Sequence, residues 1–236
     1  LSNFQPPTGF RWNTNDLAIC MALSLPFFLC SKKFLVQFLG VLLVSTLVIM
    51  TSSRAVFLAL ILIYTLYIIL IKKRLGTLVF VWFISLILIF GIYQFRDSEN
   101  PRINEVANSI EAAMLYLSGQ VDVGGSLEWR TELIKNGLTA FYNTNFLGLG
   151  AGGTVANQEI IGPVAQRFTS MHNFWIELLV EGGLFVGIII VLWIFLIIYD
   201  LFKISKNDEN KTIQYYSQSL FLSMFAFIPA AIAASS

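Results

Sequence analysis

Charged residues, cysteine and histidine are all scarce in this sequence. Asp, Glu, Lys and Arg make up 12% of the chain against 56% hydrophobic residues, and the mean hydropathy is +0.74. Because soluble domains carry about 25% charged residues, this composition excludes an ordinary soluble domain and predicts a membrane protein. Cys20 and Cys30 lie ten residues apart on one predicted helix, about 15 Å along its axis, which excludes a disulfide between them.

Long apolar runs predict an all-α, polytopic fold, since roughly 20 apolar residues cross a bilayer. The predicted spans are 14–31, 34–51, 55–71, 75–93 and 173–199, with a sixth beginning near 214. This organisation gives four spans within 1–93, a long extracytoplasmic loop with amphipathic helices over 94–171, and one full and one truncated span within 172–236. The chain starts at Leu1, carries no cleavable signal pattern and ends in an apolar run, so we expect a fragment of a larger multi-span protein.

Lysine clusters lie between the predicted spans and reach the same side when the spans alternate. The clustered residues are Lys32, Lys33, Lys72, Lys73, Lys203, Lys206 and Lys211. Because cytoplasmic loops are enriched in lysine and arginine, this side is predicted to be the cytoplasm. Arg54, the loop 94–171 and His172 then face the outside.

The middles of the predicted spans lack Asp, Glu, Lys, Arg and His. A proton- or ion-coupled transporter usually places ionisable groups at that depth, so chemistry at the outer boundary of the membrane fits better. Asp97 and Glu99 form a D-x-E pair beyond the fourth span. They offer oxygen ligands to a divalent metal, although solvated acidic residues are common at a loop entrance, and this second interpretation is favoured.

The segment NFLGLGAGGT is rich in glycine, which permits close backbone approach and positive φ angles. Its glycines are Gly148, Gly150, Gly152 and Gly153. No lysine follows as in a nucleotide-binding loop and no strand is predicted before it, so a nucleotide site is not expected. A structural turn is favoured over a phosphate cradle.

His172 is the last polar residue but one before a long apolar span, and Asn173 and Glu177 follow it. A histidine at the water boundary titrates near neutral pH and can take a proton from a hydroxyl, with Asn173 or Glu177 orienting its ring. The alternative is an interfacial histidine satisfied by solvent.

Two arginines are further candidates. Arg54 ends the short connection between the second and third spans, where it either binds phosphate oxygens bidentately or snorkels to lipid headgroups. Arg130 lies in the first turn of a predicted helix that starts near Ser126. A cation is unfavourable at that end of the helix dipole, so we expect an anionic partner, either Glu128 or Glu132.

Four segments, in their order and spacing, resemble the O-antigen ligase and polymerase superfamily of bacterial envelope glycosyltransferases: TGFRWNTNDLA, TSSRA, SLEWRTELIKNGLTAFYNTNFLGLGAGGT and SMHNFWIELLVEGGLFVG. The resemblance implies an enzyme of the bacterial cytoplasmic membrane with its active site on the extracytoplasmic face. It would transfer a glycan from an undecaprenyl-diphosphate carrier to a saccharide acceptor, with inversion at the anomeric carbon.

The resemblance also implies roles for individual residues. Arg54 and Arg130 would hold the diphosphate, His172 would activate the acceptor hydroxyl, and Asn173 and Glu177 would contribute to substrate binding. No metal or cofactor is expected. The expected partners are the polyprenyl-diphosphate-linked donor, the saccharide acceptor, membrane lipids and envelope polysaccharide assembly proteins, without nucleic acid.

Two other functional classes remain open. A flippase or other transporter of lipid-linked oligosaccharide would also expose arginines to diphosphate, and it predicts matched internal repeats, which the sequence does not show. A non-catalytic scaffold for envelope assembly would tolerate substitution of Arg54 and His172. A polymerase and a ligase differ in the acceptor that they use, and no residue in the sequence indicates the acceptor.

Overall fold

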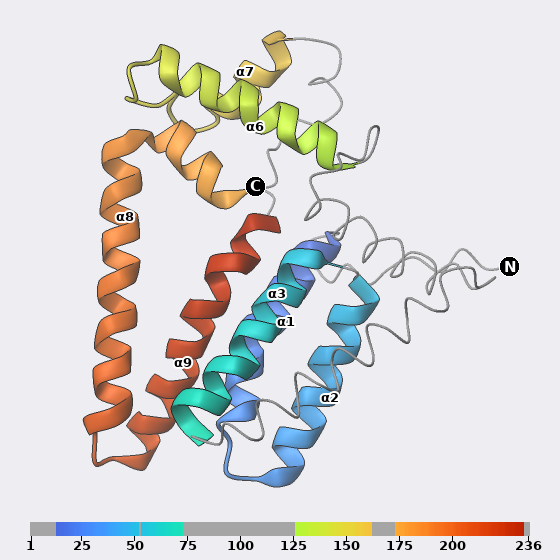
Figure 1. Ribbon diagram of the computed structural model, residues 1–236, viewed down its shortest axis with the longest axis vertical. Coiled ribbons are helices and arrows are strands. Elements are labelled where there is room, and N and C mark those ends of the chain that lie inside the picture. The colour runs from blue at the N-terminus through green and yellow to red at the C-terminus, as the bar shows by residue number, and fades with distance from the viewer. Residues whose placement is uncertain (1–12, 52, 73–125, 162–172, 234–236) are drawn as a thin grey trace, which may run out of the picture. The chain divides into compact units, whose positions relative to one another are not determined.

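A computed structural model describes residues 13–51, 53–72, 126–161 and 173–233 of the chain, and these residues fold almost entirely into helices (Figure 1). The helices are α1 (Thr14–Leu29), α2 (Phe34–Thr51), α3 (Arg54–Leu66), a π-helix (Tyr67–Lys72), α6 (Ser126–Asn143), α7 (Gly153–Ile161), α8 (Phe174–Asn207), α9 (Lys211–Ala230) and a 3-10 turn (Ala231–Ala233). The all-α prediction is confirmed. The predicted spans fall on these helices, except 75–93, which lies outside the described residues.

Asparagine side chains begin several of these helices, as expected for a residue that readily accepts a hydrogen bond from the first turn. Asn13 Oδ1 accepts from the Asn15 amide at 2.9 Å before α1. Asn210 Oδ1 accepts from the Thr212 amide at 2.9 Å before α9. Asn173 has the same role before α8.

The chain divides into two compact units, one of Leu1–Ile63 with Trp129–Ser236 and the other of Tyr64–Glu128. In the second unit, the described chain continues from α3 into the π-helix, where the Lys72 ammonium lies 5.5 Å from the centre of the Tyr67 ring. Lysine stems often lie along apolar surface in this way while the charge stays near water.

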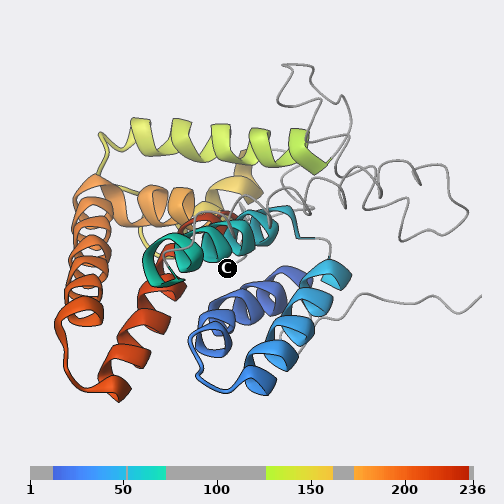
Figure 2. The same cartoon turned by 60° about the horizontal axis from the view of Figure 1, so that its bottom comes forward.

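Two helical hairpins, α1–α2 and α8–α9, form the core of the first unit, and α1 packs against α9 (Figure 2). The Tyr215 hydroxyl of α9 donates to the Phe27 carbonyl of α1, and the Ser223 hydroxyl donates to the Leu23 carbonyl, both at 2.7 Å. Between them Ser219 is fully buried. Small hydroxyl side chains let two helices approach closely and bond across the interface.

These contacts make α1 and α9 antiparallel, so the end of α1 lies beside the beginning of α9. The α1–α2 turn and the α8–α9 turn therefore lie at the same end of the unit. The lysines at this end are Lys32, Lys33, Lys203, Lys206 and Lys211. Two of the three lysine clusters used in the topology prediction therefore lie at the same end of the first unit.

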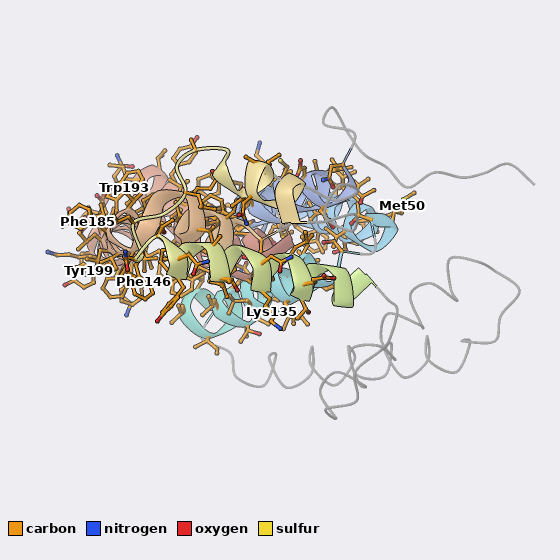
Figure 3. The ribbon with its side chains drawn as sticks, turned by 90° about the horizontal axis from the view of Figure 1, so that it is seen from above. Met50, Lys135, Phe146, Phe185, Trp193 and Tyr199 are labelled. Atoms are coloured by element: carbon orange, nitrogen blue, oxygen red, sulfur yellow. The ribbon has the colours of Figure 1, made fainter. Side chains whose placement is uncertain are left out.

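Two stretches of the described chain are long and apolar enough to cross a membrane by length and composition, Ala55–Lys72 and Phe174–Asn207. Helix α8 leaves large apolar side chains uncovered along most of its length. Phe185, Trp193 and Tyr199 are 76%, 63% and 56% exposed and project outward from it (Figure 3). A surface of this size and composition is typical of a face that meets lipid or further helices.

Candidate functional site

Helix α8 is interrupted near its beginning, at Gly183, where φ is 81° and ψ is 171°. The segment 174–182 therefore leaves the axis of the long segment that follows it, as the sharp bend in Figure 1 shows. In a continuous helix the Leu184 amide would donate to the Val180 carbonyl. Here it donates instead to the Phe146 carbonyl at 2.9 Å.

The glycine-rich loop after α6 supplies the hydrogen bonds that the interruption removes. The Leu149 amide donates to the Val180 carbonyl at 2.8 Å, and the Gly150 amide donates to the Glu181 carbonyl at 3.0 Å. Buried backbone groups without partners cost several kcal/mol in apolar surroundings. The loop is therefore a backbone partner of the broken helix, which agrees with the expected structural turn.

Glycine is required where the loop meets the break. A Cβ atom on Gly148 would lie 2.5 Å from the Gly183 nitrogen and 2.6 Å from the Glu181 carbonyl oxygen, and a Cβ atom on Gly183 would collide with the Leu147 carbonyl. Both glycines also have positive φ, 88° and 81°, which side chains disfavour. Two motifs that are separate in the sequence thus interlock through their backbones.

Apolar packing anchors α6 beside this junction. Phe141, near the end of α6, and Val180 of α8 form a buried cluster with Leu149 and Leu179 packed against it. Phe146 adds an edge-on ring contact with Phe141, with ring centres 5.3 Å apart. The helix that carries Arg130 is therefore tied at its far end to the first segment of α8.

Helix α7 begins on the carboxylate of Glu181. The Thr154 amide lies 3.3 Å from Glu181 Oε1, and the Thr154 hydroxyl donates to the same oxygen. A carboxylate at a helix N-terminus is favoured both by the helix dipole and by the unpaired amides of the first turn. Thr154 is fully buried, so the clamp joins the end of the glycine-rich loop to α8.

The beginning of α8 is fixed on the end of α9. The Trp175 indole donates to the Ile228 carbonyl at 2.9 Å. The Phe174 ring lies 5.3 Å from the Trp175 ring and 5.5 Å from the Phe227 ring, both in edge-on contacts. These bonds hold the segment that directly follows His172.

A pocket of about 370 Å³ opens beside this segment. Two carboxylates one helical turn apart, an aromatic ring and small residues line it: Ala151, Phe174, Glu177, Leu178, Glu181 and Gly182. Glu177 is 8% exposed. The described lining therefore combines two carboxyl groups, one of them buried, with apolar side chains.

Two of the predicted site residues, Asn173 and Glu177, lie at this place. Asn173 Oδ1 accepts from the Trp175 and Ile176 amides at 3.2 and 3.3 Å, so its oxygen caps α8. Glu177 lines the pocket. A substrate-binding role for either residue stays a prediction.

The other predicted residues are located only in part. Arg54 is the first residue of α3 and Arg130 is the fifth residue of α6, just after its first turn, with only their backbones described. His172, like Asp97 and Glu99, lies outside the described residues, so convergence of the two arginines and the histidine stays a prediction. Among the described residues, no cluster of three or more His, Cys, Asp or Glu side chains could hold a metal ion.

The connection before Arg54 contains an unusual polar atom. Ser53 is 3% exposed, and its hydroxyl oxygen has no hydrogen-bond partner within the described part of the chain. Buried hydroxyls are nearly always bonded. The Ser53 hydroxyl can therefore still donate a hydrogen bond next to the N-terminus of α3.

Sequence reasoning missed Glu181, Thr154 and Gly183 as parts of this arrangement. The Gly182-Gly183 pair inside an apolar run was the available signal, because glycine in a helix interior often marks an interruption. No local pattern indicated that Glu181 would cap a helix 27 residues earlier in the chain.

Comparison with known proteins assigns the family. No curated protein matches the chain. The family model described as O-antigen ligase matches residues 39–192, more than half of the chain. The matched range runs from α2 through the junction of the glycine-rich loop with α8, and the chain belongs to the O-antigen ligase family of membrane proteins, whose function lies in cell-envelope polysaccharide synthesis.

Proposed function

We propose that the protein transfers a glycan from an undecaprenyl-diphosphate carrier to a saccharide acceptor on the extracytoplasmic face of the bacterial cytoplasmic membrane. The observation that carries this proposal is the family match over residues 39–192. That range contains all five predicted site residues: Arg54, Arg130, His172, Asn173 and Glu177. The identity of the acceptor distinguishes a polymerase from a ligase.

Charge compensation is the central step of the proposed mechanism. A sugar joined to a diphosphate is a reactive donor when cations stabilise the negative charge on the departing lipid diphosphate. Arg54 and Arg130 supply this stabilisation, and guanidinium groups bind phosphate oxygens bidentately. Such groups act most strongly where water is excluded and their direction is fixed in advance.

Proton removal is the second step. His172 takes the proton from the attacking acceptor hydroxyl, a contribution of about 10²- to 10⁴-fold. The hydroxyl attacks the anomeric carbon opposite the leaving diphosphate, which inverts its configuration. No metal or cofactor takes part in this scheme.

The described structure supports this scheme at two places. The first is the buried hydroxyl of Ser53, which has no hydrogen-bond partner within the described part of the chain and directly precedes Arg54, where a phosphate oxygen would accept its hydrogen bond. The second is the start of α8, which directly follows His172 in the sequence and is capped by Asn173 and bonded to α9 by Trp175. Catalytic groups need such fixed supports.

A multi-pass topology with lysines inside completes the proposal. The α1–α2 and α8–α9 turns share one end of the first unit, and both carry lysine clusters. The start of α8 lies at the opposite end of the α8–α9 hairpin from these lysines. If the lysine end is cytoplasmic, the pocket and the Asn173 cap face the outside.

Lysine substitution of the two arginines tests the mechanism. Arg54→Lys and Arg130→Lys keep the charge but remove bidentate binding, so we expect transfer in complemented cells to fall at least tenfold with the protein level unchanged. Arg74→Lys, directly after Lys72 and Lys73 on the predicted cytoplasmic side, is the matched control and should transfer normally. Normal glycan output from both test variants would contradict the proposed role.

Replacement of the histidine separates transfer from transport. In His172→Ala cells, we expect lipid-linked donor to accumulate where a membrane-impermeant reagent reaches it from outside. Accumulation only on the cytoplasmic side would indicate a flippase instead. An unchanged donor pool with normal polysaccharide would indicate a scaffold.

A further inference from the structure

Two uncharged stretches of the sequence meet where the glycine-rich loop contacts α8. Neither 136–158 nor 182–199 contains Asp, Glu, Lys, Arg or His. The Leu184 amide donates to the Phe146 carbonyl at 2.9 Å, so the two stretches are in direct contact at the break in α8. An uncharged surface therefore continues from the loop onto the long segment of α8.

The loop exposes apolar side chains at this contact. Leu147 and Tyr142 are 80% and 68% exposed, and Phe146 is also exposed. The Tyr142 and Phe146 rings lie 5.6 Å apart in an edge-on contact, and Phe146 lies on the same side of the first unit as Phe185 of α8 (Figure 3). We call Tyr142, Phe146 and Leu147 the loop tip. Contiguous exposed apolar residues of this kind mark an interaction surface.

Beyond the break, α8 is apolar on several sides and not along one stripe. Large exposed side chains occur at consecutive positions, as at Leu184, Phe185 and Val186, and again at 191–193, and consecutive residues point in different directions around a helix. A helix that packs on protein is usually apolar along one stripe, whereas one that is apolar all round is typical of a membrane span. Because the chain belongs to a family of membrane proteins, lipid is the expected surrounding of this segment.

The uncharged part of α8 beyond the break is shorter than the bilayer core. From Leu184 to Tyr199 it is about 24 Å long at 1.5 Å per residue, whereas the hydrocarbon core is about 30 Å thick. Charges begin at the far end with Asp200, and charged side chains are costly within the core. The core therefore extends roughly 6 Å past Leu184, which is the level of the loop residues bonded to it.

We infer that the loop tip inserts into the bilayer beside α8, and that the membrane boundary passes through the break at Gly183. Its occupant is lipid, with acyl chains around Leu147 and headgroups near Tyr142, since tyrosine is enriched at membrane–water interfaces. The segment 174–182 and its pocket then lie at the water boundary, outside the core that the span predicted over 173–199 would cross. This inference goes beyond the proposed glycan transfer and would stand without it.

Fluorescence quenching at single positions tests the insertion. The full chain carrying Cys20→Ala and Cys30→Ala receives one new cysteine, Leu147→Cys or Tyr142→Cys, and is labelled with an environment-sensitive fluorophore in lipid nanodiscs. The nanodisc lipids carry a nitroxide quencher either near the headgroup or near the end of an acyl chain, and iodide quenches from the water. Both test side chains are exposed, so melting temperatures should match that of the cysteine-free protein.

Two further labelled positions are the matched controls, Trp193→Cys within the span and Glu132→Cys at an exposed position of α6. Because the interface lies at headgroup level, we expect the headgroup-level nitroxide to quench both loop-tip labels at least about twofold more strongly than iodide or the deep nitroxide. The deep nitroxide should quench Trp193→Cys most strongly, and iodide should quench Glu132→Cys most strongly.

Two results would overturn the insertion. Iodide quenching of the Leu147→Cys label without lipid quenching would place the loop tip in water. A label that neither iodide nor lipid quenches would show that protein covers the loop tip, either further spans or a second copy of the chain.

Discussion

The junction between the glycine-rich loop and α8 predicts that two glycines only four residues apart respond very differently to alanine. Gly148 and Gly152 both have positive φ, 88° and 73°. A Cβ atom on Gly148 would collide with the backbone of Gly183 and Glu181, whereas a Cβ atom on Gly152 meets nothing within 4 Å. Gly152→Ala therefore reports the backbone strain alone, and Gly148→Ala reports the strain together with the lost junction.

The two magnitudes follow from the contacts. A side chain in the left-handed region costs about 1–2 kcal/mol, which is the whole expected effect of Gly152→Ala. In Gly148→Ala the loop must move away from α8, which breaks the bonds of the Leu149 and Gly150 amides. The Leu149 amide bonds to the carbonyl of the fully buried Val180, where an unpaired group costs about 1–3 kcal/mol, whereas Gly150 is exposed and its amide can bond to water. Together with the strain, we expect a total destabilisation of about 2–5 kcal/mol.

Thermal unfolding in detergent, followed by tryptophan fluorescence, measures the difference. Hydrogen exchange gives the local readout: the Leu149 and Gly150 amides should be protected in the wild type and in Gly152→Ala but exchange rapidly in Gly148→Ala. Equal destabilisation by both substitutions, with protection retained in both, would refute the interlocking of the two backbones.

Three further substitutions test other contacts of the first unit. Thr154→Val removes the hydroxyl that donates to Glu181 while keeping the side-chain shape, and should lower the free energy of unfolding by about 1.5–3 kcal/mol, as for a hydrogen bond to a charged group. Thr154→Ser keeps the hydroxyl and should stay near the wild type, so equal melting temperatures of the two variants would contradict the bond between Thr154 and Glu181. Ser223→Ala should lower the free energy of unfolding by less than about 1 kcal/mol, in line with single hydrogen bonds between membrane helices. Ser223→Leu should destabilise the protein far more, because the larger side chain would push α1 away from α9, and similar melting temperatures of the two variants would argue against close packing there. Trp175→Phe keeps the ring contact with Phe227 but removes the indole donor, so the free energy of unfolding should fall by about 1 kcal/mol. An unchanged free energy of unfolding would show that the hydrogen bond to α9 contributes nothing to stability.

The helices were predictable from the sequence because apolar length and breaking residues are local properties. The spans 14–31 and 34–51 correspond to α1 and α2, and the predicted tip falls between Thr51 and Arg54, where α3 begins. Ser126 is the first helical residue of α6 rather than its cap, a difference of one position. Cys20 and Cys30 form no disulfide with each other, as their spacing required.

The broken start of α8 was not predictable in the same way. The run after Asn173 has the composition of one straight span, and a Gly-Gly pair within it is compatible with a continuous helix at a cost of about 1 kcal/mol per glycine. The break becomes favourable only because the loop at Leu149 and Gly150 returns the lost hydrogen bonds. That partner lies some 30 residues earlier, beyond the reach of any local pattern.

The glycine-rich motif and the motif that follows His172 are therefore best understood as two halves of one structural element. Each alone would leave backbone groups unpaired in apolar surroundings: the loop its amides at Leu149 and Gly150, and α8 its carbonyls at Val180 and Glu181. Together they satisfy one another, and Glu181 adds a side-chain bond that starts α7. Because Ala151 of the loop lines the pocket together with residues of α8, the same interlocking that stabilises the break also shapes this pocket. A substitution that loosens the junction should therefore speed hydrogen exchange at the Leu149 and Gly150 amides even when every pocket-lining side chain is retained.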